Sequence, residues 1–215
     1  DLHSITGLTE TEQDLRRNKS EYFKAMLESV DTEIGRLLDS MDAETRANTY
    51  VMIIGDNGTG GSLAQEPYKS IGAKGSLQVG GIHTPMIIYN PYKDGNGAEI
   101  DTLVSTIDFY PTVLDILDLD TNLDLPGSSF YSLVADTPDR YNPNEFVFSQ
   151  DLESAAVRSD DYKLIRFETG EERFYHVISD QFEENNLATG GIPSNHQSGY
   201  DSISTALNNY LQGNY

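Results

Sequence analysis

Three polar side chains, Asp56, Asn57 and Lys74, have the types and the spacing needed to bind a metal ion together with an anion. The Asp-Asn pair directly follows an apolar run at residues 50–54, and a glycine-rich loop follows the pair. Carboxylate and amide oxygens suit a hard cation such as calcium or magnesium. Lys74 lies further along the same loop and adds a positive charge. Together these residues indicate a site for an anionic oxyester, whereas Asp-Asn-Gly taken by itself is more often a plain turn.

Apolar runs on both sides of this loop predict the strands that position it. Residues 50–54 are rich in β-branched and aromatic side chains, and residues 85–89 form a second run of this kind. In an open α/β sheet, ligands bind at the carboxyl ends of the strands, because the loops diverge there and leave a crevice. Residues 20–41 carry apolar side chains at three- and four-residue spacing, which predicts a helix with one core-packing face. That face comprises Phe23, Met26, Leu27, Val30, Ile34, Leu37, Leu38 and Met41.

The last third of the chain has a different pattern, with short apolar segments separated by turn-like sequences. Such spacing predicts consecutive antiparallel strands, followed by a closing helix at residues 202–211. Polar residues and two prolines at residues 136–144 mark the best domain boundary, which gives domains of residues 1–136 and 137–215. The expected strands are residues 145–149, 155–158, 162–167 and 173–178.

The charge of the chain limits its partners. Its 35 acidic residues outnumber 14 basic ones, giving a formal net charge of −21. A nucleic-acid binder needs a positive surface, so this class is excluded, and the simplest explanation of the acidity is a well-solvated surface. No segment approaches the ~18 apolar residues of a transmembrane helix, so no membrane partner is expected. Cysteine is absent, which excludes disulfides.

Four motifs, the first of which has two parts, are found in the same order and resemble the second half of a sulfatase of the alkaline phosphatase superfamily. Residues 55–58 read Gly-Asp-Asn-Gly and residues 74–85 read Lys-Gly-Ser-Leu-Gln-Val-Gly-Gly-Ile-His-Thr-Pro. The family has Ser-Asp-Asn-Gly and then Lys-Gly-(Thr/Ser)-Leu-(Tyr)-Glu-Gly-Gly-Ile-Arg-Val-Pro. Further matches begin at Asp108-Phe-Tyr-Pro-Thr, at Ala156-Val-Arg and at Phe174-Tyr-His. The departures, which concern substrate preference, are Gln78, Val79, His83 and Thr84.

The resemblance implies a role for each candidate residue. Asp56 and Asn57 would be metal ligands, and Lys74 would contact the sulfate and its leaving oxygen. The implied cofactor is a divalent cation, with Ca²⁺ expected first and Mg²⁺ as the alternative. The family nucleophile is a formylglycine made within a (Cys/Ser)-x-Pro-(Ser/Ala)-Arg motif, which this sequence lacks, so it is expected only in an N-terminal half outside this chain. The implied substrate is a sulfate ester, either an aryl sulfate or a sulfated carbohydrate, and the implied location is periplasmic or secreted.

The expected fold is α/β. A partial mixed sheet with flanking helices would be followed by a small antiparallel sheet and a C-terminal helix. One edge of this sheet is expected to be left unpaired, because the complete sheet would need strands from the other half. Self-association is expected to cover that edge. Two ligand side chains fall short of the 6 to 8 oxygens around calcium, so the chain by itself is expected to show no turnover.

Two alternatives to a sulfatase fragment remain. One is a related phosphate or phosphonate ester hydrolase, although such enzymes more often have Asp-His, so that Asn57 and Lys74 favour sulfate. The other is a noncatalytic, sulfatase-like scaffold.

Overall fold

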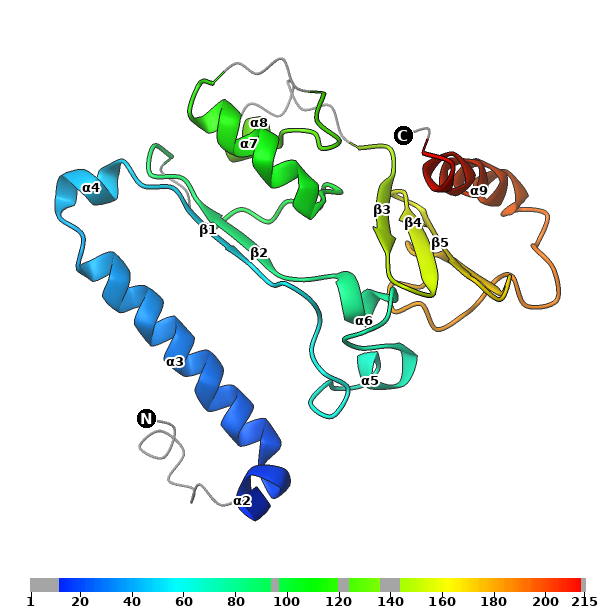
Figure 1. Ribbon diagram of the computed structural model, residues 1–215, viewed down its shortest axis with the longest axis horizontal. Helices are drawn as coiled ribbons and strands as arrows, with labels where there is room; N and C mark the ends of the chain where they lie inside the picture. The colour runs from blue at the N-terminus through cyan, green and yellow to red at the C-terminus, as the bar shows by residue number, and fades with distance from the viewer. Residues whose placement is uncertain (1–11, 94–96, 120–123, 136–143, 214–215) are drawn as a thin grey trace.

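The computed structural model describes residues 12–93, 97–119, 124–135 and 144–213 (Figure 1). Helices, one short 3₁₀ turn and two separate antiparallel sheets make up this part of the chain. The helices are α2 (Glu12–Arg17), α3 (Lys19–Asp39), α4 (Ala43–Ala47), α5 (Tyr68–Ile71), α6 (Val79–Ile82), α7 (Phe109–Ile116), α8 (Tyr131–Val134) and α9 (Gln197–Leu211). The 3₁₀ turn is η1 (Thr106–Asp108), and the strands are β1 (Val51–Ile54), β2 (Met86–Tyr89), β3 (Val147–Gln150), β4 (Ser154–Arg158), β5 (Tyr162–Phe167) and β6 (Glu172–His176).

The C-terminal sheet confirms the expected meander of antiparallel strands. Its order is β3-β4-β5-β6, so each strand pairs with the next one along the chain. Short connections make this pairing possible, and the β5–β6 turn contains Gly170 at φ 83°, a left-handed conformation that glycine adopts without strain. The expected closing helix is also present, although α9 begins five residues earlier than the sequence predicts.

Side chains alternate between the two faces along each strand, and apolar side chains cover both faces of this sheet. On one face, Leu164 and Phe174 pack against Ile203 and Leu207 of α9. On the other, Ile165 packs in a cluster with side chains from the segment around α6. Figure 1 shows α6 and α9 on opposite sides of the sheet. The second cluster comprises Leu77, Ala156, Ile165, Tyr175 and Val177, with Ile82 and Phe167 against it.

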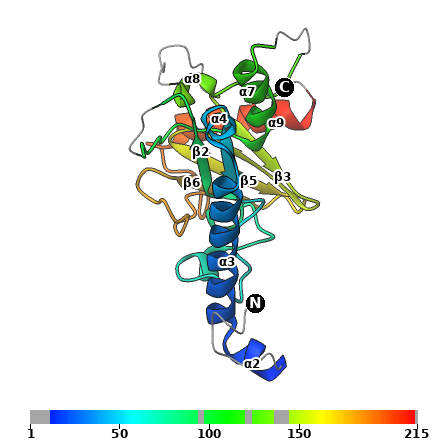
Figure 2. The ribbon, with the colours of Figure 1, turned by 90° about the vertical axis from the view of Figure 1, so that its left-hand side faces the viewer.

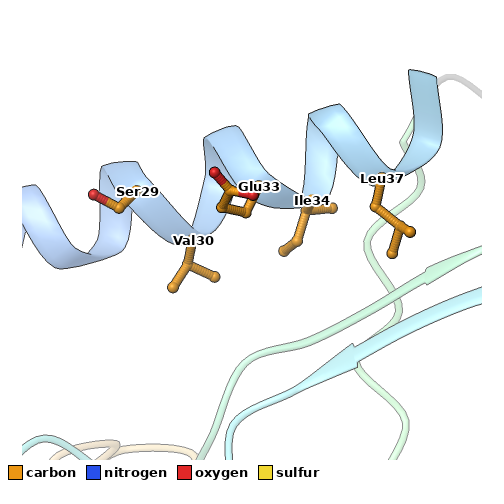
Figure 3. Close-up of a pocket in the computed structure, with 5 residues that line it drawn as sticks. All are labelled: Ser29, Val30, Glu33, Ile34 and Leu37. Carbon is orange, nitrogen blue, oxygen red and sulfur yellow. The ribbon is translucent and has the colours of Figure 1, made fainter. Parts of the chain in front are cut away.

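The N-terminal region has a much thinner core. Strands β1 and β2 pair antiparallel with Val51 opposite Tyr89, and α3 runs lengthwise past them with α2 at its far end (Figure 2). The predicted core-packing face of α3 is wrong for this structure: Val30 is 56% exposed and Leu37 is 59% exposed. Figure 3 shows Val30, Ile34 and Leu37 pointing toward the side on which β1 and β2 lie, where they line an apolar hollow. The helix is therefore amphipathic as predicted, but its apolar face is uncovered.

Asp108 supports the local fold between the two sheets. Its side chain is fully buried and accepts hydrogen bonds from the Ser105 N–H (2.7 Å), the Ser128 N–H (2.8 Å) and the Asn144 side-chain amide (2.8 Å). Asp108 occupies the N-cap position of α7, but its side chain makes no cap hydrogen bond to that helix, and the bond from Ser105 instead forms part of the capping box of η1. The proposed domain boundary lies almost wholly at residues 136–143, outside the described residues, so the two-domain division stays a prediction.

The α/β fold class, with a small antiparallel sheet and a C-terminal helix, is confirmed. Short helices also occur in two connecting segments. The polar connection before β1 contains α4, whose first turn is capped by Asp42 through the Thr45 N–H at 2.8 Å. The glycine-rich loop contains two helical turns, α5 and α6, instead of being irregular throughout. Among the described helices, none combines the length and the apolar character of a membrane span.

Candidate functional site

The Asp-Asn pair lies where the sequence places it, immediately beyond the carboxyl end of β1. The ladder between β1 and β2 continues for one more bond, from the Gly55 N–H to the Pro85 carbonyl at 3.0 Å. The chain then bends, leaving Asp56 exposed and Asn57 partly buried. These two oxygen-bearing side chains therefore directly follow a strand that is paired as far as Gly55.

Two backbone hydrogen bonds join the Asp-Asn loop to the rest of the glycine-rich segment. The Gly58 N–H donates to the Gly81 carbonyl at 2.8 Å, and the Lys74 N–H donates to the Thr59 carbonyl at 3.0 Å. The backbone of Lys74 therefore lies beside Thr59, two positions after Asn57. The Lys74 side chain is exposed. The fold thus brings together the backbone of all three predicted site residues.

Glycines allow this close approach of backbone to backbone. A Cβ atom added to Gly58 would clash with the carbonyl oxygen of Gly80, and one added to Gly81 would clash with the carbonyl oxygen of Ser76. Neither clash could be relieved by moving a flexible side chain, because both obstacles are backbone atoms. Glycine at positions 58 and 81 is therefore a steric requirement of this loop.

A buried ion pair, which the sequence did not identify as part of the site, holds the start of α6. Lys163 of β5 and Glu183 have side chains that are 2% and 3% exposed, with 2.6 Å between Nζ and Oε1. The other oxygen of Glu183 accepts a hydrogen bond from the Val79 N–H at 2.9 Å. Burial lowers the pKa of Lys163, and the attraction of Glu183 opposes that effect. A lysine directly before the apolar residues Leu164 and Ile165 was the available signal.

Gln78 adds a second link between this segment and the C-terminal sheet. Its side chain is buried and accepts a hydrogen bond from the Arg173 guanidinium at 3.3 Å. Arg173 also lies over the ring of Phe167, 4.8 Å from its centre, which orients the guanidinium. Gln78 is one of the positions that depart from the sulfatase pattern, and here it has a packing role. His83 ends α6, and its side chain is exposed.

The donor chemistry of Asp56 and Asn57 fits part of a hard-cation site. One carboxylate and one amide oxygen next to each other at a strand end suit calcium or magnesium, which take oxygen ligands. Calcium takes 6 to 8 oxygens, so these two side chains would need further ligands. Within the described ranges, no group of three or more His, Cys, Asp or Glu side chains is arranged to hold a metal ion. The pair is thus compatible with the metal as a partial ligand set.

Comparison with known proteins places these features in a family. The family model described as Sulfatase matches residues 6–119, which include all three candidate site residues. A second model, described as N-sulphoglucosamine sulphohydrolase, C-terminal, matches residues 76–212. The two matches share residues 76–119. The shared residues include α6, which links the site loop to the C-terminal sheet.

Individual relatives agree with the family match. Arylsulfatase K of Xenopus laevis is 27% identical over 199 residues, which covers 85% of this chain and 36% of that protein. A putative sulfatase from Bacteroides thetaiotaomicron has the same fold, with a TM-score of 0.76 at 18% identity, covering 99% of this chain and 46% of the other. A structure of BT4656 in complex with its substrate D-glucosamine-2-N,6-O-disulfate has a TM-score of 0.69 at 21% identity, covering 89% and 40%.

This chain spans 36% of that curated relative and less than half of each of those two solved structures. The Sulfatase match nevertheless covers more than half of the 215 residues and contains the strand-end Asp-Asn pair and the lysine loop. The chain belongs to the sulfatase family.

Proposed function

We propose that this chain forms part of a hydrolase of sulfate esters, to which it contributes Asp56 and Asn57 as ligands of a divalent cation and Lys74 as a contact to the sulfate. One observation carries the proposal. The Gly58–Gly81 and Lys74–Thr59 backbone hydrogen bonds hold the Asp-Asn pair and the lysine on joined loops at the end of β1. The family match over residues 6–119 supports this assignment, because it includes these loops.

Each residue has a task that suits its chemistry. The Asp56 carboxylate and the Asn57 amide oxygen would hold calcium, or magnesium as the alternative. The cation, when bound, polarises the sulfate oxygens. The Lys74 ammonium group would offset charge on the sulfate and on its leaving oxygen. In a chain of net charge −21, such a local positive focus is needed to attract an anionic substrate.

The nucleophile is assigned to polypeptide outside these 215 residues. The sequence has no cysteine and no Ser-x-Pro-x-Arg, so the chain offers no precursor for the formylglycine of this family. We therefore expect no turnover by the chain alone. A sulfated carbohydrate is the favoured substrate class, supported by the disulfated glucosamine bound to one structural neighbour, and an aryl sulfate is the alternative.

The test compares the complete translated product that contains these residues with the 215-residue chain. Both are assayed with calcium on 4-nitrophenyl sulfate, on a sulfated glucosamine and on an aryl phosphonate ester. We expect the complete product to prefer the sulfates. Asp56→Ala and Lys74→Ala should each lower its turnover by about a hundredfold or more, because each removes charge stabilisation of the transition state. Glu99→Ala, which removes an exposed carboxylate outside the loop, is the matched control.

Four results would contradict this proposal. Equal turnover by the complete product and its Asp56→Ala variant would refute the metal-ligand role. A preference for the phosphonate ester would favour the related hydrolase class, and absence of all turnover would favour a noncatalytic scaffold. Turnover by the 215-residue chain, lost on Asp56→Ala, would show that no outside nucleophile is needed.

A further inference from the structure

The Lys163–Glu183 ion pair is the most deeply buried ion pair of the described residues, and the proposed chemistry does not use it. Both side chains are almost fully removed from water. Taking two charges out of water costs free energy that their attraction repays only with good geometry and further hydrogen bonds. Here the short Nζ–Oε1 distance of 2.6 Å is supplemented by a backbone hydrogen bond to the second carboxylate oxygen.

That second hydrogen bond leaves the C-terminal sheet and enters the site segment. Glu183 Oε2 accepts from the Val79 N–H at 2.9 Å, although the two residues lie 104 positions apart. Val79 is the first residue of α6, so this N–H belongs to the first helical turn and has no partner within the helix. A carboxylate held in place by Lys163 satisfies it.

From α6 the connection continues to the candidate ligands in a few covalent and hydrogen-bonded steps. Gly81, two residues after Val79, offers its carbonyl to the Gly58 N–H at 2.8 Å. Gly58 directly follows Asn57 in the chain. The apolar contacts of Leu77 and Ile82 press the same segment onto the sheet, but such contacts are not directional. The carboxylate therefore supplies a directed contact that apolar packing cannot provide.

We propose that Glu183, oriented by Lys163, is a positioning residue that fixes the start of α6 and, through Gly81, the loop that carries Asp56 and Asn57. The C-terminal sheet then does more than complete the fold, since it sets the placement of the Asp-Asn pair. The inference rests on the proposed function only in naming that pair as metal ligands. Its structural part concerns the loop alone and can be tested without metal.

Two double variants isolate the contact to Val79 from the stability of the ion pair. Lys163→Met with Glu183→Gln removes both charges and keeps a side-chain oxygen for the Val79 N–H. Lys163→Met with Glu183→Met removes both charges and that oxygen. Neither leaves an unpaired buried charge, which would endanger folding. A third variant, Arg166→Met with Glu172→Gln, breaks a less buried ion pair of the same sheet and controls for general loosening.

Amide hydrogen exchange of the 215-residue chain, without metal, is the first measurement. We expect residues 55–60 and 74–83 to exchange about tenfold faster or more in the Met/Met variant than in the Met/Gln variant, because a hydrogen bond that ties them down is lost. Strand β5 and helix α9 should exchange alike in both, and the Arg166/Glu172 control should leave the two loops unchanged. Equal loop exchange in the two double variants would overturn the proposal. Uniformly faster exchange over the whole sheet would also overturn it, since the pair would then serve only stability.

Calcium titration of the complete translated product extends the test to the ligands. The Met/Met variant should bind calcium about tenfold more weakly than the Met/Gln variant, which is the effect expected when an outer contact no longer orients a ligand. Equal calcium affinity in the presence of a loosened loop would overturn the coupling to the ligands. If the unmodified product binds no calcium, the metal role in the proposed function fails, and the exchange result still decides the positioning role of Glu183.

Discussion

The two halves of the described structure differ in how completely they bury their apolar side chains. Most buried hydrophobic residues lie beyond residue 144, in or beside the β3–β6 sheet and α9; the earlier ones are Tyr22, Ala25, Leu77 and Phe130. In the N-terminal region, Leu37 is 59% exposed on α3 and Ile87 is 61% exposed on β2. The C-terminal unit thus has a closed core, to which Leu77 and Ile82 of the α6 segment contribute, whereas α3 and β2 present apolar side chains that the described structure leaves exposed.

This difference explains where the candidate site is firmly held. Its loop is anchored on the side of the C-terminal sheet, through α6 and the buried Glu183. On the other side it continues into β1, whose Ile53 and Ile54 are partly exposed. The candidate loop therefore joins a well-packed region on one side and a sparsely packed region on the other. Three measurements test this difference between the two regions.

The largest effect is expected from shortening a side chain in the C-terminal core. Leu164→Ala should lower the free energy of unfolding by about 3 kcal/mol or more, because it leaves a cavity in a fully buried cluster. Leu37→Ala on the exposed face of α3 should change it by less than about 0.5 kcal/mol. Urea unfolding followed by circular dichroism and tyrosine fluorescence measures both, since the chain has no tryptophan. Equal losses would show that the α3 face is covered in solution.

A smaller effect is expected from the alkaline behaviour of Tyr175. Burial, aided by the negative charge of Glu183, raises the pKa of Tyr175 to about 12 from its usual value of 10. Because the folded-state pKa is the higher one, its contribution to stability is complete below pH 10 and is lost as the pH rises through 12. The unmodified chain should therefore lose about 2 kcal/mol more between pH 9 and 12 than Tyr175→Phe.

Unfolding curves at intervals over that pH range provide the measurement for Tyr175. Tyr89→Phe is the control, since the Tyr89 side chain is about half exposed on β2. Identical alkaline profiles for the unmodified chain and Tyr175→Phe would mean that the second cluster opens to water well below pH 12.

The smallest effect concerns association of the 215-residue chain. An exposed strand edge beside uncovered apolar side chains should lead to self-association that depends on concentration. Ile87→Lys places a charge on β2 and should weaken the association about tenfold, whereas Leu211→Lys on α9 should leave it unchanged. Sedimentation velocity over a range of concentrations tests this. If the chain stays monomeric at every concentration, the exposed edge does not cause self-association.

Sequence reasoning predicted the elements that depend on local pattern. The alternating strands from β3 to β6 and the helical periodicity of α3 are properties of neighbouring residues, and both appear in the structure. The position of Asp56 and Asn57 at the end of β1 follows in the same way, because a short apolar run must end where polar and glycine residues begin. The metal role of that pair stays a prediction.

Three further features depend on long-range packing: burial of the α3 face, formation of α6 and the contact between Glu183 and Val79. Periodicity shows which side chains share a face of α3, but burial depends on whether another element covers that face, and Leu37 remains exposed. The α6 turn forms where two consecutive glycines argue against a helix, because packing of Leu77 and the bond to Glu183 outweigh weak propensity. The pairing of Glu183 with Val79 joins residues 104 positions apart, and no local pattern encodes such a contact. Sequence thus determined what each segment can form, while long-range packing determined what each segment touches.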